Sequence, residues 1–192
     1  MDFLDTLMNI DEDILLYIQE NIRNASADKI MKAVTHLGDM GILWVIIIFT
    51  LLVSKKYKKT AFVMALTLSL GLLITNLILK NSVHRTRPFH AIEKLFPLIN
   101  KPKDWSFPSG HATSSIGCGI AMLRNLPKRY GISGFTIGLL IAVSRMYLGV
   151  HYTTDVVAGA LIGTFSAFTS EKIINKADNI ISEKRRQKKS PQ

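Results

Sequence analysis

Two long stretches of this sequence contain almost no charge, and they constrain the fold more than any other feature. Thr60 to Leu79 has no charged residue, and Ala33 to Ser54 is interrupted only by Asp39. Both stretches reach the roughly 20 residues that a helix needs to cross the hydrocarbon core of a bilayer. The sequence therefore predicts two membrane-spanning helices.

Three shorter apolar stretches follow these two. They are Ser106 to Leu123, Tyr130 to Ser144 continuing past Arg145, and Val156 to Ser170. Buried helices of a soluble all-α protein can have this length. However, 48% of the 192 residues are apolar, which leaves too little polar sequence to cover five such helices in water. We therefore expect an all-α polytopic membrane helical bundle with about five transmembrane helices.

The formal net charge of +10 could indicate a nucleic-acid partner, so the position of the basic residues matters. Most of them lie in residues 55–59, in residues 124–129 and in the tail after Ser170. With five spans these three places face one side of the membrane, and cytoplasmic segments are enriched in Lys and Arg. This bias predicts a cell-membrane protein with an outer N-terminus and a cytoplasmic C-terminus. Membrane lipids, and no nucleic acid, are then the expected partners.

By composition the chain divides into three parts. Residues 1–32 carry Ile14, Leu15 and Ile18 at helical spacing, which predicts an amphipathic helix. It lies on the outer leaflet or packs on the protein's own spans. Residues 33–170 form the membrane-embedded part. Residues 171–192 form a basic cytoplasmic tail that suits the anionic inner leaflet, with nucleic acid as the weaker alternative.

Three polar clusters interrupt the apolar sequence near the ends of the predicted spans. In the first, Lys80 is followed seven residues later by Arg87 and then by Pro88. Seven residues are close to two helical turns, so both cations share one face if the helix continues to Pro88. Seen alone, Lys80 is typical of a lysine at a membrane boundary. We expect the intervening His84 and Arg85 in the lipid headgroup zone.

The second cluster is the run Pro108-Ser109-Gly110-His111 at the start of the third predicted span. Proline and glycine favour a turn there, which places a helix N-terminus and its free N–H groups at the site. Such a terminus binds anions, and Gly110 lets an oxyanion approach the backbone closely. Ser109 either donates a hydrogen bond to a phosphate or caps the helix. His111 follows at the edge of this pocket.

The third cluster comprises Ser144-Arg145, His151 and Asp155. On a helix the spacing of His151 and Asp155 lets the carboxylate reach one imidazole nitrogen and leaves the other free to attack. Arg145 has the planar donors that suit bidentate phosphate binding. Together the clusters supply three cations, two histidines, a carboxylate and a glycine turn. This combination is typical of a site for phosphoryl transfer through a histidine.

The three clusters resemble the signature of the type 2 phosphatidic acid phosphatase family, and they match it at every specified position. The resemblance covers residues 80 to 155, and the family's helical core would cover about 33 to 170. It implies that His151 is the nucleophile, that Asp155 orients it, and that His111 protonates the leaving oxygen and later activates water. The phosphoryl oxygens would be held by Lys80, Arg87, Ser109, Gly110 and Arg145. It also implies no metal and no cofactor.

An outward site at headgroup depth suits a phospholipid or polyprenyl (di)phosphate better than a soluble phosphomonoester. Within the resembling family, undecaprenyl diphosphate is the first expectation, and phosphatidylglycerol phosphate or phosphatidate is the alternative. Vanadium haloperoxidases share the signature, but they are soluble and much longer. A non-enzymatic anion transporter would distribute its basic residues through the spans, whereas here they cluster at one membrane face. The sequence predicts no particular oligomeric state.

Overall fold

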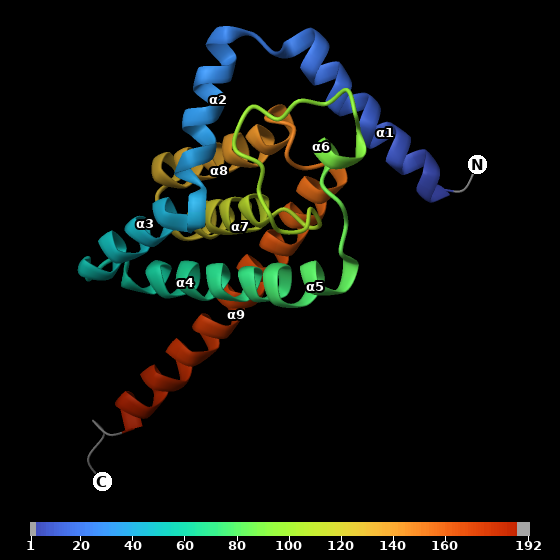
Figure 1. The fold of residues 1–192 in the computed structure, drawn as a ribbon. Coiled ribbons are helices and arrows are strands. Elements are labelled where there is room, and N and C mark those ends of the chain that lie inside the picture. The colour runs from blue at the N-terminus through green and yellow to red at the C-terminus, as the bar shows by residue number, and fades with distance from the viewer. Residues whose placement is uncertain (1–2, 188–192) are drawn as a thin grey trace.

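The computed structural model describes residues 3–187, and within that range every regular element is a helix (Figure 1). The elements are α1 (Phe3–Tyr17), η1 (Ile18–Ile22), α2 (Ala25–Leu37), η2 (Asp39–Gly41), α3 (Ile42–Val53), α4 (Lys58–Leu72), η3 (Leu73–Leu79), α5 (Lys80–Val83), α6 (Pro88–Ala91), α7 (Gly110–Asn125), α8 (Lys128–Tyr147) and α9 (Thr153–Gln187). The all-α prediction is confirmed. The end of the predicted basic tail, residues 188–192, lies outside the described residues.

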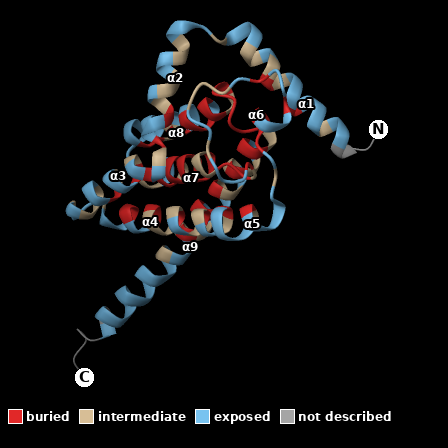
Figure 2. Cartoon of the chain, viewed as in Figure 1, coloured by how far each residue is buried: buried red, intermediate tan, exposed pale blue. Residues whose placement is uncertain are grey.

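Helix α7 forms the centre of the bundle and packs against α4, α8 and α9 (Figure 1). Glycines on the neighbouring helices make this close packing possible. A Cβ atom at Gly138 of α8 would lie 2.4 Å from the Ser115 carbonyl oxygen, and one at Gly163 of α9 would lie 2.4 Å from that of Thr113. Small residues at helix interfaces allow such approach between membrane helices, where no water drives association. Buried positions accordingly concentrate on α7 (Figure 2).

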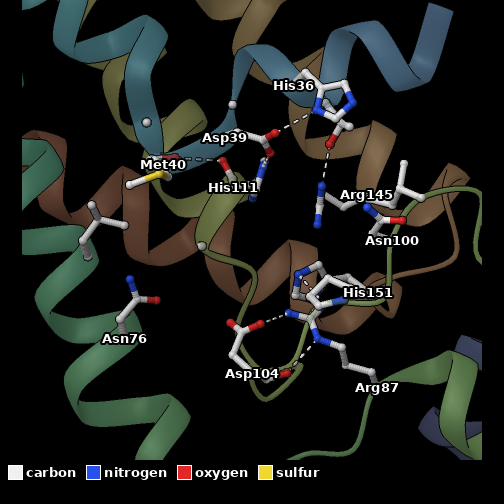
Figure 3. A pocket seen from close by; sticks show the side chains of 18 of the residues that line it. His36, Asp39, Met40, Asn76, Arg87, Asn100, Asp104, His111, Arg145 and His151 are labelled. Carbon is white, nitrogen blue, oxygen red and sulfur yellow. Dashed lines mark hydrogen bonds and ion pairs between the residues drawn. The ribbon is translucent and has the colours of Figure 1, made fainter. Parts of the chain in front are cut away.

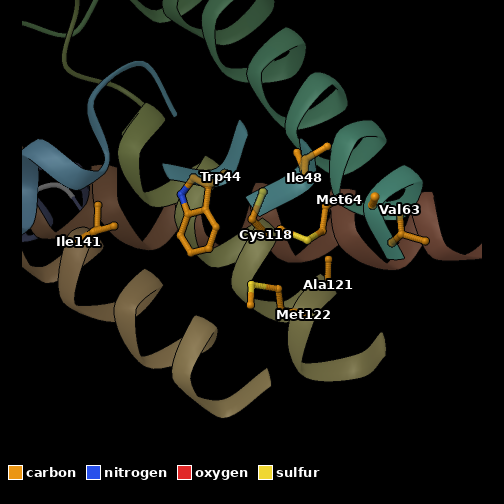
Figure 4. Close-up of a cluster of buried hydrophobic side chains, with 9 residues drawn as sticks. Trp44, Ile48, Val63, Met64, Cys118, Ala121, Met122 and Ile141 are labelled. Carbon is orange, nitrogen blue, oxygen red and sulfur yellow. The ribbon is translucent and has the colours of Figure 1, made fainter. Parts of the chain in front are cut away.

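The largest apolar cluster joins α3, α4, α7 and α8 (Figure 4). Trp44 is fully buried there, and its indole Nε1 donates a hydrogen bond to Ser115 Oγ of α7 at 3.1 Å. Cys118, Met64 and Met122 pack in the same cluster. This cluster fixes α7 against α3, α4 and α8, and α7 begins at the second polar motif.

By length and composition, one helical segment, Lys58–Ala91, can cross a membrane, and the bent pair Ala25–Leu37 and Asp39–Val53 can form a second span. Helix α7 is interior to the bundle, so its Ser and Thr residues face other helices and not lipid. Large apolar side chains such as Phe49, Leu77 and Phe165 are exposed on the outside of the bundle. The number of five spans remains a prediction.

The first apolar stretch is bent, whereas the sequence predicted one uninterrupted span. Helix α2 and the segment Asp39–Val53 meet at 44°. Met40 and Gly41 adopt left-handed backbone with φ of 51° and 69°, which interrupts the helical hydrogen-bond ladder. Asp39, the single acid of this stretch, lies at the bend.

The N-terminal segment packs in part on the protein itself. Leu15 of α1 is fully buried in a cluster with Ile92, Leu95 and Tyr152. Met8 of the same helix is 60% exposed. At the other end of the chain, α9 continues without a break past Ser170, and its C-terminal half projects away from the bundle (Figure 1).

Candidate active site

One cavity of about 960 Å³ collects most of the residues that the sequence singled out (Figure 3). Its walls include Lys80, Arg87, Gly110, His111, Arg145 and His151. The other two predicted site residues, Ser109 and Asp155, are fully buried and do not line it. The structure therefore brings all three polar clusters to one place, with six of the eight predicted side chains or backbone positions at the cavity surface.

His151 lies in the loop between α8 and α9, two residues before α9 begins. The sequence predicted a single helix for His151 and Asp155, and this detail is wrong, because α9 begins only at Thr153 and leaves His151 in the preceding loop. Asp155 in the first turn of α9 still reaches back, and its Oδ2 lies 3.4 Å from His151 Nδ1. At this separation no hydrogen bond to Nδ1 is formed. Catalytic hydrogen bonds are often long in unliganded sites and shorten when substrate binds.

The other imidazole nitrogen of His151 faces a cation. Nε2 lies 3.2 Å from the NH1 group of Arg87. Arginine has only donors, so Nε2 accepts this hydrogen bond and is unprotonated. Burial, with the charges of Arg87 and Arg145, lowers the pKa of His151 to about 3 despite the nearby Asp155. The structure thus provides a neutral imidazole with a lone pair on Nε2.

Asp155 is held by partners on several sides. Its Oδ2 accepts hydrogen bonds from Ser106 Oγ and from the backbone N–H of Tyr152. Its backbone carbonyl accepts from the N–H of Ser109, which links α9 to the second motif. A fully buried carboxylate requires such partners. The position of Asp155 relative to His151 is therefore fixed by contacts with the loop before α7 and with the loop before α9.

Arg85 has a different role from the one expected. The sequence placed it in the lipid headgroup zone, but its NH1 donates to Asp155 Oδ1 at 2.7 Å and its NH2 to Asp11 Oδ2 at 2.9 Å. Its guanidinium also lies 3.8 Å from the ring centroid of Tyr152. Arg85 therefore connects the orienting carboxylate to buried Asp11 of α1. No local spacing in the sequence signals this contact, because its partners lie 70 and 74 positions away.

Lys80 and Arg87 converge on a carboxylate that the sequence did not single out. The Lys80 ammonium contacts Asp104 Oδ2, and Arg87 NH2 donates to Asp104 Oδ1 at 2.7 Å. Burial opposes ionisation, yet the hydrogen bond from Lys80 and the charge of Arg87 lower the pKa of Asp104 to about 2. The two cations do not share a helix face as the spacing allowed, since the helix ends at Val83. Arg87 is extended before Pro88, as proline favours.

Arg145 reaches the cavity from the last turn of α8. Its NH1 donates to Thr35 Oγ1 at 2.5 Å. Its Nε is buried and has no hydrogen-bond partner among the described residues. An unpaired buried donor is costly and marks a place where an anion would be favourable.

The second motif forms the predicted helix N-terminus. Ser109 is the N-cap of α7, and its Oγ accepts from the Ala112 N–H at 3.4 Å, so of the two roles considered for Ser109 the resting structure has the cap. Gly110 begins the helix at the cavity wall. His111 Nε2 lies 3.1 Å from Asp39 Oδ1, a contact between residues 72 positions apart. Within residues 3–187, no group of three or more His, Cys, Asp or Glu side chains could hold a metal ion.

Comparison with known families places these motifs inside a single match. A model of the PAP2 superfamily matches residues 58–178. An undecaprenyl-diphosphatase of Sulfolobus acidocaldarius is 30% identical over 131 residues, 68% of this chain but only 63% of that protein. Phosphatidylglycerophosphatase B of Bacillus subtilis is 31% identical over 159 residues, 77% of this chain and 75% of that protein.

Solved structures show the same arrangement of helices. The transmembrane PAP2-type phosphatidylglycerolphosphate phosphatase of Bacillus subtilis superposes with a TM-score of 0.71 at 28% identity, covering 89% of this chain and 87% of that chain. LpxE of Aquifex aeolicus superposes with a TM-score of 0.74 at 25% identity, covering 83% and 93%. These relatives support a membrane location and a phosphoric ester hydrolase.

Proposed function

The chain belongs to the PAP2 superfamily, and from that premise we propose that it is an integral-membrane lipid phosphatase that works through a phosphohistidine intermediate without a metal ion. The environment of His151 carries this proposal. His151 lines the cavity, its unprotonated Nε2 lies beside Arg87, and Asp155 lies near Nδ1. A neutral imidazole oriented by a carboxylate and surrounded by cations is what a nucleophile for a phosphate ester requires.

In the first step, Arg87 NH1 donates to a phosphoryl oxygen in place of His151 Nε2, Nε2 attacks phosphorus, a P–N bond forms and the P–O bond to the leaving group breaks. His111, protonated, gives its proton to the leaving oxygen. Asp155 stabilises the positive charge that develops on the His151 ring. Lys80, Arg87, Arg145 and the α7 N-terminus at Gly110 neutralise the phosphoryl oxygens as charge redistributes. Ser109 supports this terminus as its cap.

In the second step, a water molecule attacks the phosphohistidine. His111, which has lost its proton to the leaving group, accepts a proton from this water. The P–N bond breaks, inorganic phosphate is released and His151 returns to its neutral form. The same histidine therefore acts as acid and then as base, so the two steps require opposite protonation states of His111 when each begins.

Among lipid phosphates, we favour undecaprenyl diphosphate, which would be converted to undecaprenyl phosphate. Relatives in Sulfolobus acidocaldarius and Bacillus subtilis carry the name undecaprenyl-diphosphatase. The cavity wall also includes Lys32 and His36, in addition to the cations of the motifs, which favours a headgroup with more than one phosphate. Phosphatidylglycerol phosphate or phosphatidate is the alternative, supported by the phosphatidylglycerophosphatase B of Bacillus subtilis.

The distribution of basic residues supports an extracytoplasmic active site. The cavity lies at the end of the bundle that carries Lys80 and His151, and the loops at residues 54–57 and 126–127 lie at the opposite helix ends. The basic residues 55–59 and 124–129 flank those opposite ends. Because cytoplasmic segments are enriched in Lys and Arg, the cavity faces outward.

The test is phosphate release by the protein purified in detergent. We expect undecaprenyl diphosphate to be hydrolysed faster than phosphatidylglycerol phosphate and phosphatidate, with no loss of rate in a chelator. His151→Ala should abolish release and should trap no phosphoenzyme. Dependence on an added divalent metal, or full activity of His151→Ala, would contradict the proposed mechanism. Equal rates on all three lipids would indicate a general lipid phosphatase.

A further inference from the structure

The cavity contains a second pair of a histidine and a carboxylate, and this carboxylate, Asp39, belongs to none of the three sequence motifs. Asp39 Oδ1 lies 3.1 Å from Nε2 of His111, and Asp39 Oδ2 lies 2.8 Å from Nδ1 of His36 (Figure 3). Asp39 is the only charged residue in the stretch from Ala33 to Ser54. An acid in a membrane-spanning stretch is costly and usually serves a function.

The backbone around Asp39 is shaped to bring it to His111. Met40, a non-glycine residue, adopts φ of 51°, a conformation that L-residues rarely adopt. On the other side of Asp39, a Cβ atom at Gly38 would lie 2.7 Å from His111 Cδ2 and 2.6 Å from a methyl carbon of Ile141. Only glycine therefore allows this turn to lie directly against the His111 ring. Unusual backbone of this kind is commonly found at functional sites.

The contact determines which nitrogen of His111 is available. Since Asp39 accepts a hydrogen bond from Nε2–H, Nε2 carries the proton in the resting state. Nδ1 forms no hydrogen bond to any residue in the range 3–187, and His111 lines the cavity. The ring also lies near the positive charges of Arg145 and Lys80. The carboxylate of Asp39 at Nε2 opposes these charges.

From this geometry we infer that Asp39 is a positioning residue for His111. It fixes the imidazole with Nδ1 toward the leaving oxygen, and it stabilises the imidazolium that donates a proton to that oxygen. This inference rests on the proposed function, because it assigns Asp39 a part in the acid and base chemistry of His111. The site then has one carboxylate for each histidine: Asp155 serves the nucleophile and Asp39 serves the acid.

The dependence of rate on the leaving group tests this role. A lipid alcohol or phosphate leaves poorly and needs a proton, whereas p-nitrophenolate leaves without one. The ratio kcat/KM reports the steps up to departure of the leaving group. For Asp39→Asn we expect kcat/KM to fall about 10- to 100-fold with the lipid phosphate and by less than about 3-fold with p-nitrophenyl phosphate.

Three further variants complete the experiment. Asp39→Glu retains the carboxylate and should recover part of the rate on the lipid phosphate. Asp178→Asn removes an acid that pairs with Lys59 far from the cavity and should leave both substrates unaffected. His111→Gln should show the same dependence on leaving group as Asp39→Asn, with a larger effect.

Two results would overturn the inference. One is an equal fall in kcat/KM on both substrates in Asp39→Asn, which a purely structural role would produce. The other is full activity of Asp39→Asn on the lipid phosphate. Neither result would affect the proposed function, which instead fails if the wild-type protein releases no phosphate or if His151→Ala keeps its activity.

Discussion

The two motif histidines of the cavity, His151 and His111, are each paired with a carboxylate, but the two pairs are built differently. The side chains of His151 and Asp155 are 2% and 0% exposed, whereas those of His111 and Asp39 are 20% and 46% exposed. Asp155 is held by side-chain and backbone donors, and Arg85 ties it to Asp11. Asp39 has two histidines as its partners and directly precedes the left-handed residues Met40 and Gly41.

This difference corresponds to the tasks that we propose for the two histidines. A nucleophile must keep one protonation state and one orientation, which burial and a neighbouring carboxylate that is itself held by several hydrogen bonds provide. An acid that later acts as a base must gain and lose a proton in each cycle. A half-exposed carboxylate supports both forms of such a group without fixing either one. The rigid pair, His151 with Asp155, and the adaptable pair, His111 with Asp39, should therefore respond differently to mutation.

The largest expected effect distinguishes His151 from His111 by whether the phosphohistidine intermediate can form. His151→Ala should lower the rate of phosphate release by more than about 1,000-fold, because no covalent intermediate can form. His111→Ala should also be slow on lipid phosphates. With p-nitrophenyl phosphate, however, it should still form the phosphohistidine and hydrolyse it slowly. Acid-labile, base-stable labelling from a radioactive substrate measures this, and labelling of His151→Ala would contradict the assignment.

The rigid pair should depend strongly on Arg85 for stability. Arg85→Met leaves buried Asp155 and Asp11 without their common cation, and removing one partner of a buried ion pair typically costs about 3 kcal/mol or more. Arg124→Met is a matched control, since Arg124 pairs with Glu171 at the surface and such pairs contribute about 1 kcal/mol or less. Unfolding in detergent measures both, and equal losses would show that Arg85 is not structurally special.

How stability changes with pH should also distinguish the buried histidine. Because burial lowers the pKa of His151, the folded protein resists protonation of a group that the unfolded chain protonates below about pH 6.5. Its contribution is complete above that pH and is lost as the pH falls toward the folded value. Between pH 6.5 and 5 the free energy of unfolding should fall by about 2 kcal/mol on this account. His151→Gln should lack this part of the slope, and parallel slopes would refute it.

The residues that the sequence identified and those that it missed differ in a physical way. Lys80, Arg87, Gly110 and Arg145 belong to short patterns whose residue types are demanded by phosphate chemistry, so spacing alone revealed them. Arg85 joins acids 70 and 74 positions away, and His111 meets an acid 72 positions away. Such pairs depend on how helices pack, and no local pattern encodes that.

The same reasoning applies to the fold. Hydrophobic stretches predicted helices, because apolar length is a local property of the chain. The bend at Asp39 was not predicted, since Met40 carries no local signal for left-handed backbone. Its position instead follows from contact with α7 and α8, where Gly38 lies against His111 of α7 and Ile141 of α8. The part of the site that the sequence could not predict is thus the part that the bend creates.

The smallest expected effect concerns Asp104. Its partner Arg87 contacts His151 of the rigid pair, but the Asp104 side chain is half exposed, like that of Asp39. In the resting structure it contacts both Lys80 and Arg87, so a substrate phosphate has to displace it from these cations. Its pKa of about 2 keeps the carboxylate ionised at neutral pH, and therefore the competition is present under ordinary assay conditions.

Asp104→Asn removes the negative charge but keeps the size of the side chain. Inorganic phosphate should then inhibit about 3- to 10-fold more strongly, because a single exposed charge pair contributes about 1 kcal/mol. The value of kcat should change little, since Asp104 contacts neither histidine directly. Glu93→Gln removes an acid from the same loop region outside the cavity wall and should leave inhibition by phosphate unchanged. Weaker inhibition in Asp104→Asn would instead mean that Asp104 positions Lys80 and Arg87 to bind phosphate. Asp104 would then support the site around His151 and Asp155 as Arg85 does, although its side chain is half exposed.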